Sequence, residues 1–304
     1  MQNQCRFPHP IDVPGLHCVH QGKVRNTYAI DGRPDLFLVS TTDRVSTHNI
    51  VHNSTIPNKG YALTAINNFW MNRLKKNGIK THLVASEKAI YDFLPKMTYP
   101  ADLHLRAIII KRLNMIPVEF IVRDFMAGSL WNDYYSKGLP NPYGIELPPG
   151  LKLMSKFAGT IFTPTDKSAT DDPINTQETT MLYRDAYDLV YEVYTDCRDF
   201  AATKSIRIID GKFEIGVDPN THEITLGDEC STPDSCRFVP MQEVIVEGKN
   251  PTWLDKQPVR EEAERVWAGD PKVPLTLSDE ICEKTSMIYS NLVYTLTGSE
   301  IETM

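Results

Sequence analysis

The residues best suited to chemistry lie between positions 210 and 229, where charged side chains alternate with apolar ones. Successive side chains of a strand point to opposite faces, so Lys212 and Glu214 share one face and Phe213 lies on the other. The next expected strand ends close to Asp228. Carboxylates that converge from neighbouring strands can hold Mg²⁺, often together with a phosphate. We therefore predict that Glu214 and Asp228 bind a metal ion and that Lys212 meets a phosphate.

This metal site depends on where the second strand ends. Simple alternation from Leu226 would point the Asp228 side chain toward the core. The side chain faces the site only if the strand ends or bulges at Gly227, which a glycine favours. The alternative is an ordinary sheet with one solvent-exposed face, which is common.

Two neighbouring segments offer groups that could bind an anion. Arg123 and Ser129 flank the start of an expected helix, where free N–H groups bind phosphate or carboxylate. Ser129 could equally be a simple helix cap. A turn at 231–237 presents Ser235 and Arg237 together, and a guanidinium can bind a carboxylate or phosphate through two hydrogen bonds. The alternative for this turn is a surface loop with an incidental arginine.

Two more segments carry cations that could meet a nucleotide. Gly22 would let the backbone approach a phosphate, and Lys23 and Arg25 could neutralise it. Taken alone, this segment is more typical of a turn with two solvated cations, and the Walker pattern is missing. Lys167 lies in a long loop, 139–172, of the kind that often forms a functional lid, and could reach a phosphate or stay solvated.

The order of the expected elements predicts an α+β fold. Runs of strands precede helices without regular alternation, and a chain of this length usually forms two lobes. The Asp210-Gly211 pair is typical of a hairpin turn between two strands. Expected strands cover 27–30, 37–40, 106–113, 118–123, 205–209, 212–217 and 223–226, and expected helices cover 62–77, 176–203, 258–268 and 278–297.

The composition argues against several classes of protein. A net charge of -7 is unfavourable for a general nucleic-acid or anionic-membrane binder. No apolar run approaches the ~20 residues that a membrane span needs, and residues 1–10 are polar without a signal-peptide core. The six cysteines form no CxxC pair, so we expect neither a zinc nor a redox site, and a cytoplasmic protein with reduced thiols is the simplest interpretation.

Ten segments, in order along the chain, are similar to those of the phosphoribosylaminoimidazole-succinocarboxamide synthase family. The similarity extends from Gly22 to Gly298. Each segment is weak by itself, but ten in the right order are highly specific. They are residues 22–25, 42–46, 56–60, 118–129, 144–148, 162–167, 212–216, 228–238, 255–257 and 296–298.

The resemblance implies a ligase of de novo purine (IMP) biosynthesis with ATP and Mg²⁺ as cofactors. ATP would convert the carboxylate of carboxyaminoimidazole ribotide, a poor electrophile, to an acyl phosphate, and the amine of L-aspartate would displace phosphate. Positioning and charge neutralisation are the usual needs of such phosphoryl transfer. The resemblance also implies a kinase-like N-terminal lobe with an antiparallel sheet at 1–116 and an ATP-grasp-like lobe with C-terminal helices at 117–304, with ATP between them.

Site roles follow from the same resemblance. The nucleotide would be bound by Gly22, Lys23, Arg25, Lys167, Lys212 and Glu214. The ribotide would be bound by Arg123, Ser129, Ser235, Arg237 and Arg260. Glu214 and Asp228 would hold Mg²⁺, and Lys212, Asp228 and Arg237 would be catalytic. The expected partners are small molecules rather than nucleic acid or membrane, and the expected assembly is a monomer or homodimer.

The chain departs from the family pattern at three places. Asn26 and Asn49 stand where the family usually has Asp, and Asp171-Asp172 replace a His-Asp pair. An amide carries no full charge and adds N–H donors, which could change the choice or rate of the amine substrate. Two alternatives therefore stay open, namely a related ligase for a different amine or carboxylate, and an ATP-binding protein without ligase activity. The retained Lys23, Lys212, Glu214, Asp228 and Arg237 argue against the latter.

Overall fold

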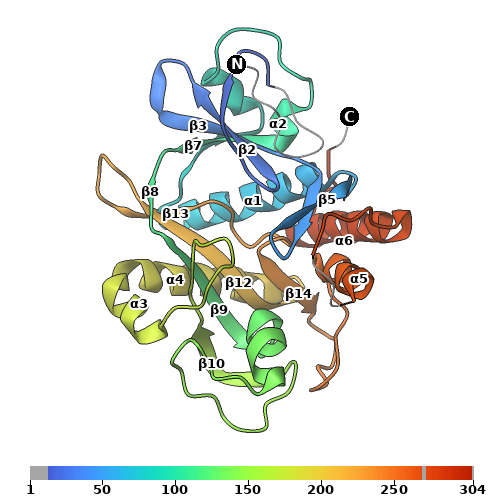
Figure 1. Cartoon of the computed structure of the whole chain (residues 1–304). Coiled ribbons are helices and arrows are strands. Elements are labelled where there is room, and N and C mark those ends of the chain that lie inside the picture. The colour runs from blue at the N-terminus through green and yellow to red at the C-terminus, as the bar shows by residue number, and fades with distance from the viewer. Residues whose placement is uncertain (1–12, 269–271, 303–304) are drawn as a thin grey trace. The chain divides into compact units, whose positions relative to one another are not determined.

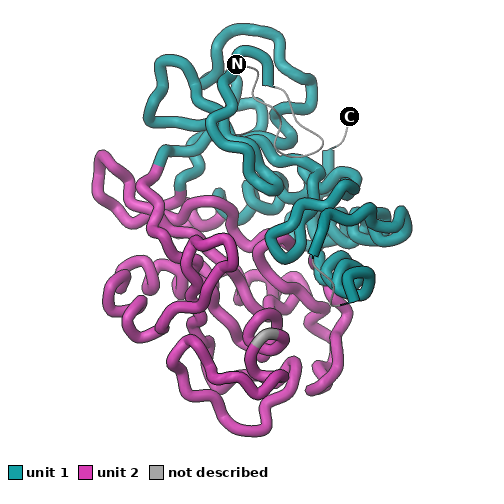
Figure 2. The backbone as a smooth tube through the Cα atoms, in the orientation of Figure 1, with its two compact units in different colours: residues 1–72, 82–112, 256–304 teal, residues 73–81, 113–255 magenta. Residues whose placement is uncertain are grey.

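The computed structural model describes residues 13–268 and 272–302 (Figure 1). Contacts between backbone positions divide the chain into two compact units (Figure 2). Unit 1 comprises residues 1–72, 82–112 and 256–304, and unit 2 comprises residues 73–81 and 113–255. The polar segment 1–10 noted in the sequence lies outside the described residues. No helix within the described ranges is both long and apolar enough to pass through a bilayer.

Unit 1 contains a five-stranded antiparallel sheet in the order β1-β2-β3-β7-β6. The predicted strands at 27–30 and 37–40 are confirmed, and Gly32, with a φ of 75°, forms the turn between them. Buried Tyr28, Leu38 and Ile109 belong to the apolar cluster of this sheet. The strands are β1 (His17–Gln21), β2 (Arg25–Ile30), β3 (Arg33–Thr41), β6 (Leu83–Ser86) and β7 (Ala107–Lys111), with two short helices at Glu87–Asp92 and Leu103–Arg106 (α2).

A separate hairpin follows the first three strands. It consists of β4 (Arg44–Thr47) and β5 (Ile50–Thr55). His48 and Asn49 form its turn with φ values of 49° and 64°, the two consecutive positive φ angles of a tight type I′ hairpin. Helix α1 (Lys59–Lys76) comes next, close to the predicted span, and Gly78 at φ 87° lies just beyond its end.

The C-terminal helices belong to unit 1. Helices α5 (Gln257–Trp267) and α6 (Asp279–Thr297) match the predicted ones, but we had expected them in the second domain, 117–304. The physical reason is an apolar cluster in which Val45 and Ile56 pack with Val259, Leu277 and Cys282. Backbone hydrogen bonds reinforce this packing, since the Asn53 N–H donates to the Leu275 carbonyl at 2.8 Å.

Unit 2 is built around β12 (Ile206–Val217), the central strand of a seven-stranded sheet. Strands β9, β13, β14 and β8 all pair with β12 in antiparallel register. The remaining strands, β10 and β11, pair with β9. The bounds are β8 (Asn114–Met115), β9 (Val118–Phe125), β10 (Lys156–Phe162), β11 (Thr165–Asp166), β13 (Ile224–Gly227) and β14 (Cys236–Pro240).

One face of the unit 2 sheet is covered by helix α4 (Arg184–Thr203), which packs against β12 (Figure 1). Val190, Val193 and Tyr194 are buried on the helix, and the Tyr194 ring lies 6.4 Å from the ring of Phe213. Because strand neighbours alternate, Lys212 and Glu214 project from the opposite face of β12.

Three local predictions in unit 2 were wrong in detail. The expected helix 176–203 is two helices, α3 (Thr176–Leu182) and α4, with Tyr183 between them. The Asn175 side chain caps α3 by accepting from the Glu178 N–H at 3.0 Å. The helix expected after Ser129 is a single π-helical turn, Leu130–Tyr134, followed by a short 3₁₀ turn, Tyr135–Lys137. Asp210-Gly211 is not a hairpin turn, because β12 continues through both residues.

Candidate active site

Lysine and glutamate side chains form a continuous ionic cluster on the open face of β12. Lys212 Nζ donates to Glu119 Oε1 at 2.7 Å, and Lys167 Nζ lies 3.3 Å from the same oxygen. Lys167 Nζ also pairs with Glu214 Oε1. Glu119 comes from the neighbouring strand β9 and its side chain is only 8% exposed. Two cations and two carboxylates from β9, β12 and the segment at Lys167 thus alternate in one place.

Their mutual electrostatics favour the charged forms of Lys212 and Glu119. Burial opposes ionisation of both groups, but the charge of Glu119 raises the pKa of Lys212 above its usual range. Conversely, burial would raise the pKa of Glu119, but Lys212 and Lys167 together hold that pKa below its ordinary value. Lys212 and Glu119 therefore form an ion pair near neutral pH.

The strand before Asp228 ends at Gly227, as the prediction for Asp228 requires. Strand β13 ends at Gly227, which pairs with Glu214, and Asp228 turns out of the strand with a φ of 47°. Burial and then the negative charge of Asp228 raise the pKa of Glu214 above its ordinary value. Asp228 directly follows Gly227, the cross-strand neighbour of Glu214.

Such a pair of carboxylates suits a divalent cation. Mg²⁺ prefers oxygen ligands and is usually held by one or two carboxylates with substrate phosphates and waters completing the octahedron. Within the described residues, no group of three or more His, Cys, Asp or Glu side chains could hold a metal ion alone.

A second cluster joins two arginines through one buried carboxylate. Asp210 Oδ2 accepts from Arg123 Nη1 at 3.0 Å and from Arg237 Nη1 at 2.6 Å. Arg123 and Arg237 are the cross-strand neighbours of Asp210 on β9 and β14. Arg123 Nη2 donates to Ser129 Oγ at 3.1 Å, so Ser129 serves the arginine rather than capping a helix. The predicted Arg123, Ser129 and Arg237 thus lie together.

The backbone at Gly128 passes directly over Arg237. Gly128 has a φ of 61°, and a Cβ there would lie 2.6 Å from the Arg237 guanidinium nitrogens. Ser235 lies two residues before Arg237, and its carbonyl accepts from the Lys212 N–H at 3.0 Å. The turn 231–237 therefore connects the arginine cluster to the lysine and glutamate cluster on β12.

The remaining predicted residues lie in unit 1. The Gly22 N–H donates to the Arg25 carbonyl at 2.7 Å, which closes a tight turn. Lys23 Nζ donates to Asn49 Oδ1. Arg260 lies on α5 and donates to Gln257 Oε1 at 3.2 Å. The two amides that depart from the family pattern thus have defined partners, since Asn26 Oδ1 accepts from Arg44 at 2.7 Å.

Sequence reasoning missed two carboxylates, Glu119 and Asp210. Glu119 is the one charged residue in the apolar run 116–122, and a buried carboxylate of this kind needs a cation partner, which was the available signal. The role of Asp210 was missed because Asp followed by Gly is typical of a turn. Its burial at 3% exposure shows that its role is to hold two arginines.

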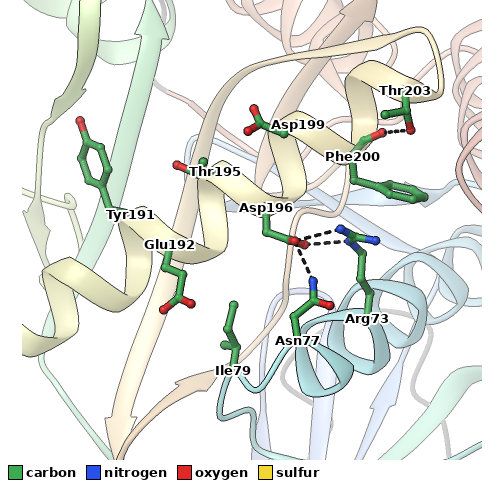
Figure 3. Close-up of a pocket in the computed structure, with 10 residues that line it drawn as sticks. All are labelled: Arg73, Asn77, Ile79, Tyr191, Glu192, Thr195, Asp196, Asp199, Phe200 and Thr203. Atoms are coloured by element: carbon green, nitrogen blue, oxygen red, sulfur yellow. Dashed lines mark hydrogen bonds and ion pairs between the residues drawn. The ribbon is translucent and has the colours of Figure 1, made fainter.

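A hollow in unit 2 is lined by residues of α4 and by Arg73, Asn77 and Ile79 (Figure 3). Asp196 on α4 points toward the end of α1, where it accepts hydrogen bonds from Arg73 and Asn77. The Arg73 guanidinium also lies 4.3 Å from the centre of the Phe200 ring. None of the predicted site residues lines this hollow, so it is a poor candidate for the chemistry.

Comparisons with known proteins agree on one family. The family model described as SAICAR synthetase matches residues 18–274. The phosphoribosylaminoimidazole-succinocarboxamide synthase of Saccharomyces cerevisiae is 34% identical, with 94% of this chain and 95% of that protein covered. The protein of the same name from Cupriavidus taiwanensis is 36% identical, with 95% and 97% covered. The solved structure of the SAICAR-synthase from Saccharomyces cerevisiae complexed with SAICAR superposes with a TM-score of 0.82 at 32% identity, covering 97% of this chain and 99% of that one.

Proposed function

Because the chain belongs to the SAICAR synthetase family, we propose that it is an ATP-dependent ligase of de novo purine biosynthesis. It joins carboxyaminoimidazole ribotide to L-aspartate and yields succinocarboxamide ribotide, ADP and phosphate. The observation that carries this proposal is the ionic cluster on β12, where Lys167 pairs with both Glu119 and Glu214 and Lys212 pairs with Glu119. The arginine cluster next to it supplies the second anion site that such a reaction needs.

The proposed mechanism divides the work between these clusters. Mg²⁺ bound with ATP would supply charge neutralisation for phosphoryl transfer to the ribotide carboxylate, which becomes an acyl phosphate. Glu214 and Asp228 would hold that ion, and Lys212 and Lys167 would neutralise phosphate oxygens. The amine of aspartate then attacks the activated carbon, the C–N bond forms, and phosphate leaves with the bonding electrons.

The ribotide belongs to the arginine cluster in this proposal. Arg237 is the more accessible of the two arginines, with a side chain 16% exposed against 3% for Arg123. We assign Arg237, Ser129 and Ser235 to the sugar phosphate or carboxylate, with Arg123 fixed behind them and Arg260 assisting. Gly22, Lys23 and Arg25 contribute to binding of the nucleotide phosphates.

The finer architecture is part of the same proposal. The antiparallel sheet of unit 1 supports a kinase-like N-terminal lobe, and the β12-centred sheet of unit 2 supports an ATP-grasp-like lobe. A cytoplasmic monomer or homodimer with small-molecule partners fits the function.

A direct assay tests this function against its alternatives. The protein is mixed with ATP, Mg²⁺, carboxyaminoimidazole ribotide and L-aspartate, and ADP and the succinocarboxamide product are followed. ADP formation that depends on both ribotide and aspartate is the expected result. ADP formation only with another amine would select a different ligase, and ATP binding without turnover would select a protein without ligase activity. The sequence identity to proteins named for the aspartate reaction favours the first outcome.

A further inference from the structure

Three successive carbonyls of the turn after β1 accept hydrogen bonds from one short segment of unit 1. The Arg44 guanidinium donates to the carbonyls of Gly22 at 3.0 Å and Lys23 at 3.2 Å. Thr42 donates to the Val24 carbonyl through both its N–H, at 2.9 Å, and its hydroxyl, at 2.6 Å. The Thr42 hydroxyl in turn accepts from the Arg44 N–H at 3.2 Å.

This arrangement fixes the direction of the peptide groups. In a planar trans peptide the C=O and the N–H point in opposite directions. Since the carbonyls of Gly22 and Lys23 converge on one guanidinium, the N–H groups of Lys23 and Val24 point away from it. Successive N–H groups that point to one side make a concave site for an anion. The Lys23 side chain, which contacts Asn49, extends from the same turn.

Arg44 is unusual in its burial. It is 0% exposed, although arginine is seldom buried completely. A third bond, to Asn26 Oδ1 at 2.7 Å, ties it to the first residues of β2. Burial of a guanidinium costs desolvation free energy, and an ordinary surface turn does not need a buried arginine to hold its carbonyls. This cost suggests that the exact direction of the peptides matters for function.

We propose that Arg44, with Thr42, is a positioning residue that presents the turn 22–25 to the phosphates of a nucleotide. It touches neither substrate nor metal, and acts by holding carbonyls inward so that N–H groups and Lys23 face the anion. The inference rests on the proposed function, since that function supplies the nucleotide. The contacts of Arg44 and Thr42 explain the conformation of the turn, which Gly22, Lys23 and Arg25 alone do not explain.

The test compares ligand affinities in matched variants. Arg44→Met removes the guanidinium bonds to Gly22, Lys23 and Asn26, Arg44→Lys retains a charge with fewer donors, and Thr42→Val removes the hydroxyl. Thr42→Ser keeps the hydroxyl, and Arg33→Met removes an exposed arginine of β3 that pairs with Asp35 at the surface. Calorimetry measures binding of ATP with Mg²⁺ and, separately, of the ribotide, while thermal unfolding reports the folded fraction.

The inference predicts a selective loss. In Arg44→Met the turn 22–25 is no longer held in one orientation, so one or two charge-assisted hydrogen bonds from the turn to the phosphates are weakened. This loss corresponds to about tenfold weaker ATP binding. Arg44→Lys and Thr42→Val should fall between this variant and the wild type, and Thr42→Ser and Arg33→Met should bind ATP as the wild type does. Ribotide affinity should stay within about twofold in every variant that folds. If Arg44→Met does not fold, Thr42→Val and Thr42→Ser provide the same comparison.

The other outcomes separate the two proposals. Unchanged ATP affinity in folded variants, or an equal loss for ATP and ribotide, would overturn the positioning role. Selective loss of ATP affinity in the Arg44 and Thr42 variants, together with a wild type that forms no product from ribotide and aspartate, would support the positioning role and overturn the ligase function. A wild type that does not bind ATP would overturn both.

Discussion

At the scale of single residues, the charged side chains that meet on one face of β12 form the candidate site. Burial and then the negative charge of Asp228 raise the pKa of Glu214. Lys167 pairs with both Glu119 and Glu214, and Lys212 pairs with Glu119. The alternation of side chains along one strand was enough to predict that Lys212 and Glu214 share a face. The sequence could not place Glu119, because its contact with Lys212 depends on the register between two strands far apart in the chain.

Asp228→Asn is expected to abolish most of the turnover while the fold is retained. The amide removes a full charge from the metal ligand set but keeps the size of the side chain. Loss of several kcal/mol of charge stabilisation corresponds to a decrease in kcat of about 100-fold or more. The measurement is the rate of ADP formation together with the melting temperature. Asp218→Asn, a buried aspartate at the other end of the β12–β13 hairpin, controls for loss of a charge in this hairpin. Near-normal activity of Asp228→Asn would remove Asp228 from the metal site.

Glu119→Gln is expected to lower both stability and activity. The lysines lose the carboxylate that they share, and with Lys212 about one-third exposed the loss should be about 1–3 kcal/mol. Since the folded pKa of Glu119 lies below its ordinary value of 4.5, its contribution is present above that pH and is lost as pH falls through the folded value. Urea unfolding at several pH values measures the free energy of unfolding of the wild type and of Glu119→Gln. The difference between these two free energies should become smaller below pH 4.5. A constant difference would contradict this role.

At the scale of elements, β12 is the strand that organises both clusters. It carries Asp210, Lys212 and Glu214 at alternate positions and pairs with β9 and β14 over the arginine cluster. The sequence predicted strands on both sides of Asp210-Gly211 but divided them with a turn. Local propensity favours a turn at this pair, but two arginines from other strands stabilise the extended conformation of Asp210. Only tertiary contacts decide between these conformations.

Gly128→Ala tests the contact between a loop and the arginine cluster. The new Cβ would lie 2.6 Å from the Arg237 nitrogens in a backbone conformation that alanine disfavours, so Arg237 must move. Displacement of one charged donor should raise the KM for the ribotide by about tenfold, with a smaller effect on the KM for ATP. Gly159→Ala on β10 is the matched control, because nothing lies within 4 Å of the place that its new methyl group would take. Equal KM values in the two variants would contradict the placement of the ribotide at Arg237.

At the scale of the whole molecule, the chain returns at its C-terminus to the unit in which it began. The helices α5 and α6 were predicted correctly from their apolar periodicity, but their assignment to a unit was not. Periodicity identifies an apolar face without naming its partner, and the partner here is the β4–β5 hairpin more than 200 residues earlier in the chain. One division between the units falls at residues 112 and 113, in the segment that connects β7 to β8.

Leu277→Ala is expected to destabilise unit 1. Leu277 is 4% exposed and packs with Val45, Ile56 and Val259, so truncation should cost about 2–5 kcal/mol. Val266→Ala, on the exposed side of α5, should cost far less. Denaturant unfolding measures both. Equal stability of the two variants would show that the C-terminal segment is not part of this core.

The central claim is that Glu214 and Asp228 together hold the divalent ion of the nucleotide. The most direct measurement is binding of Mn²⁺, as a paramagnetic substitute for Mg²⁺, to the wild type and to Glu214→Gln in the presence of ADP. The account predicts an ADP-dependent site in the wild type that is weakened about tenfold or more in the variant, because one of two charged ligands is lost. Equal Mn²⁺ affinity in both proteins would contradict it.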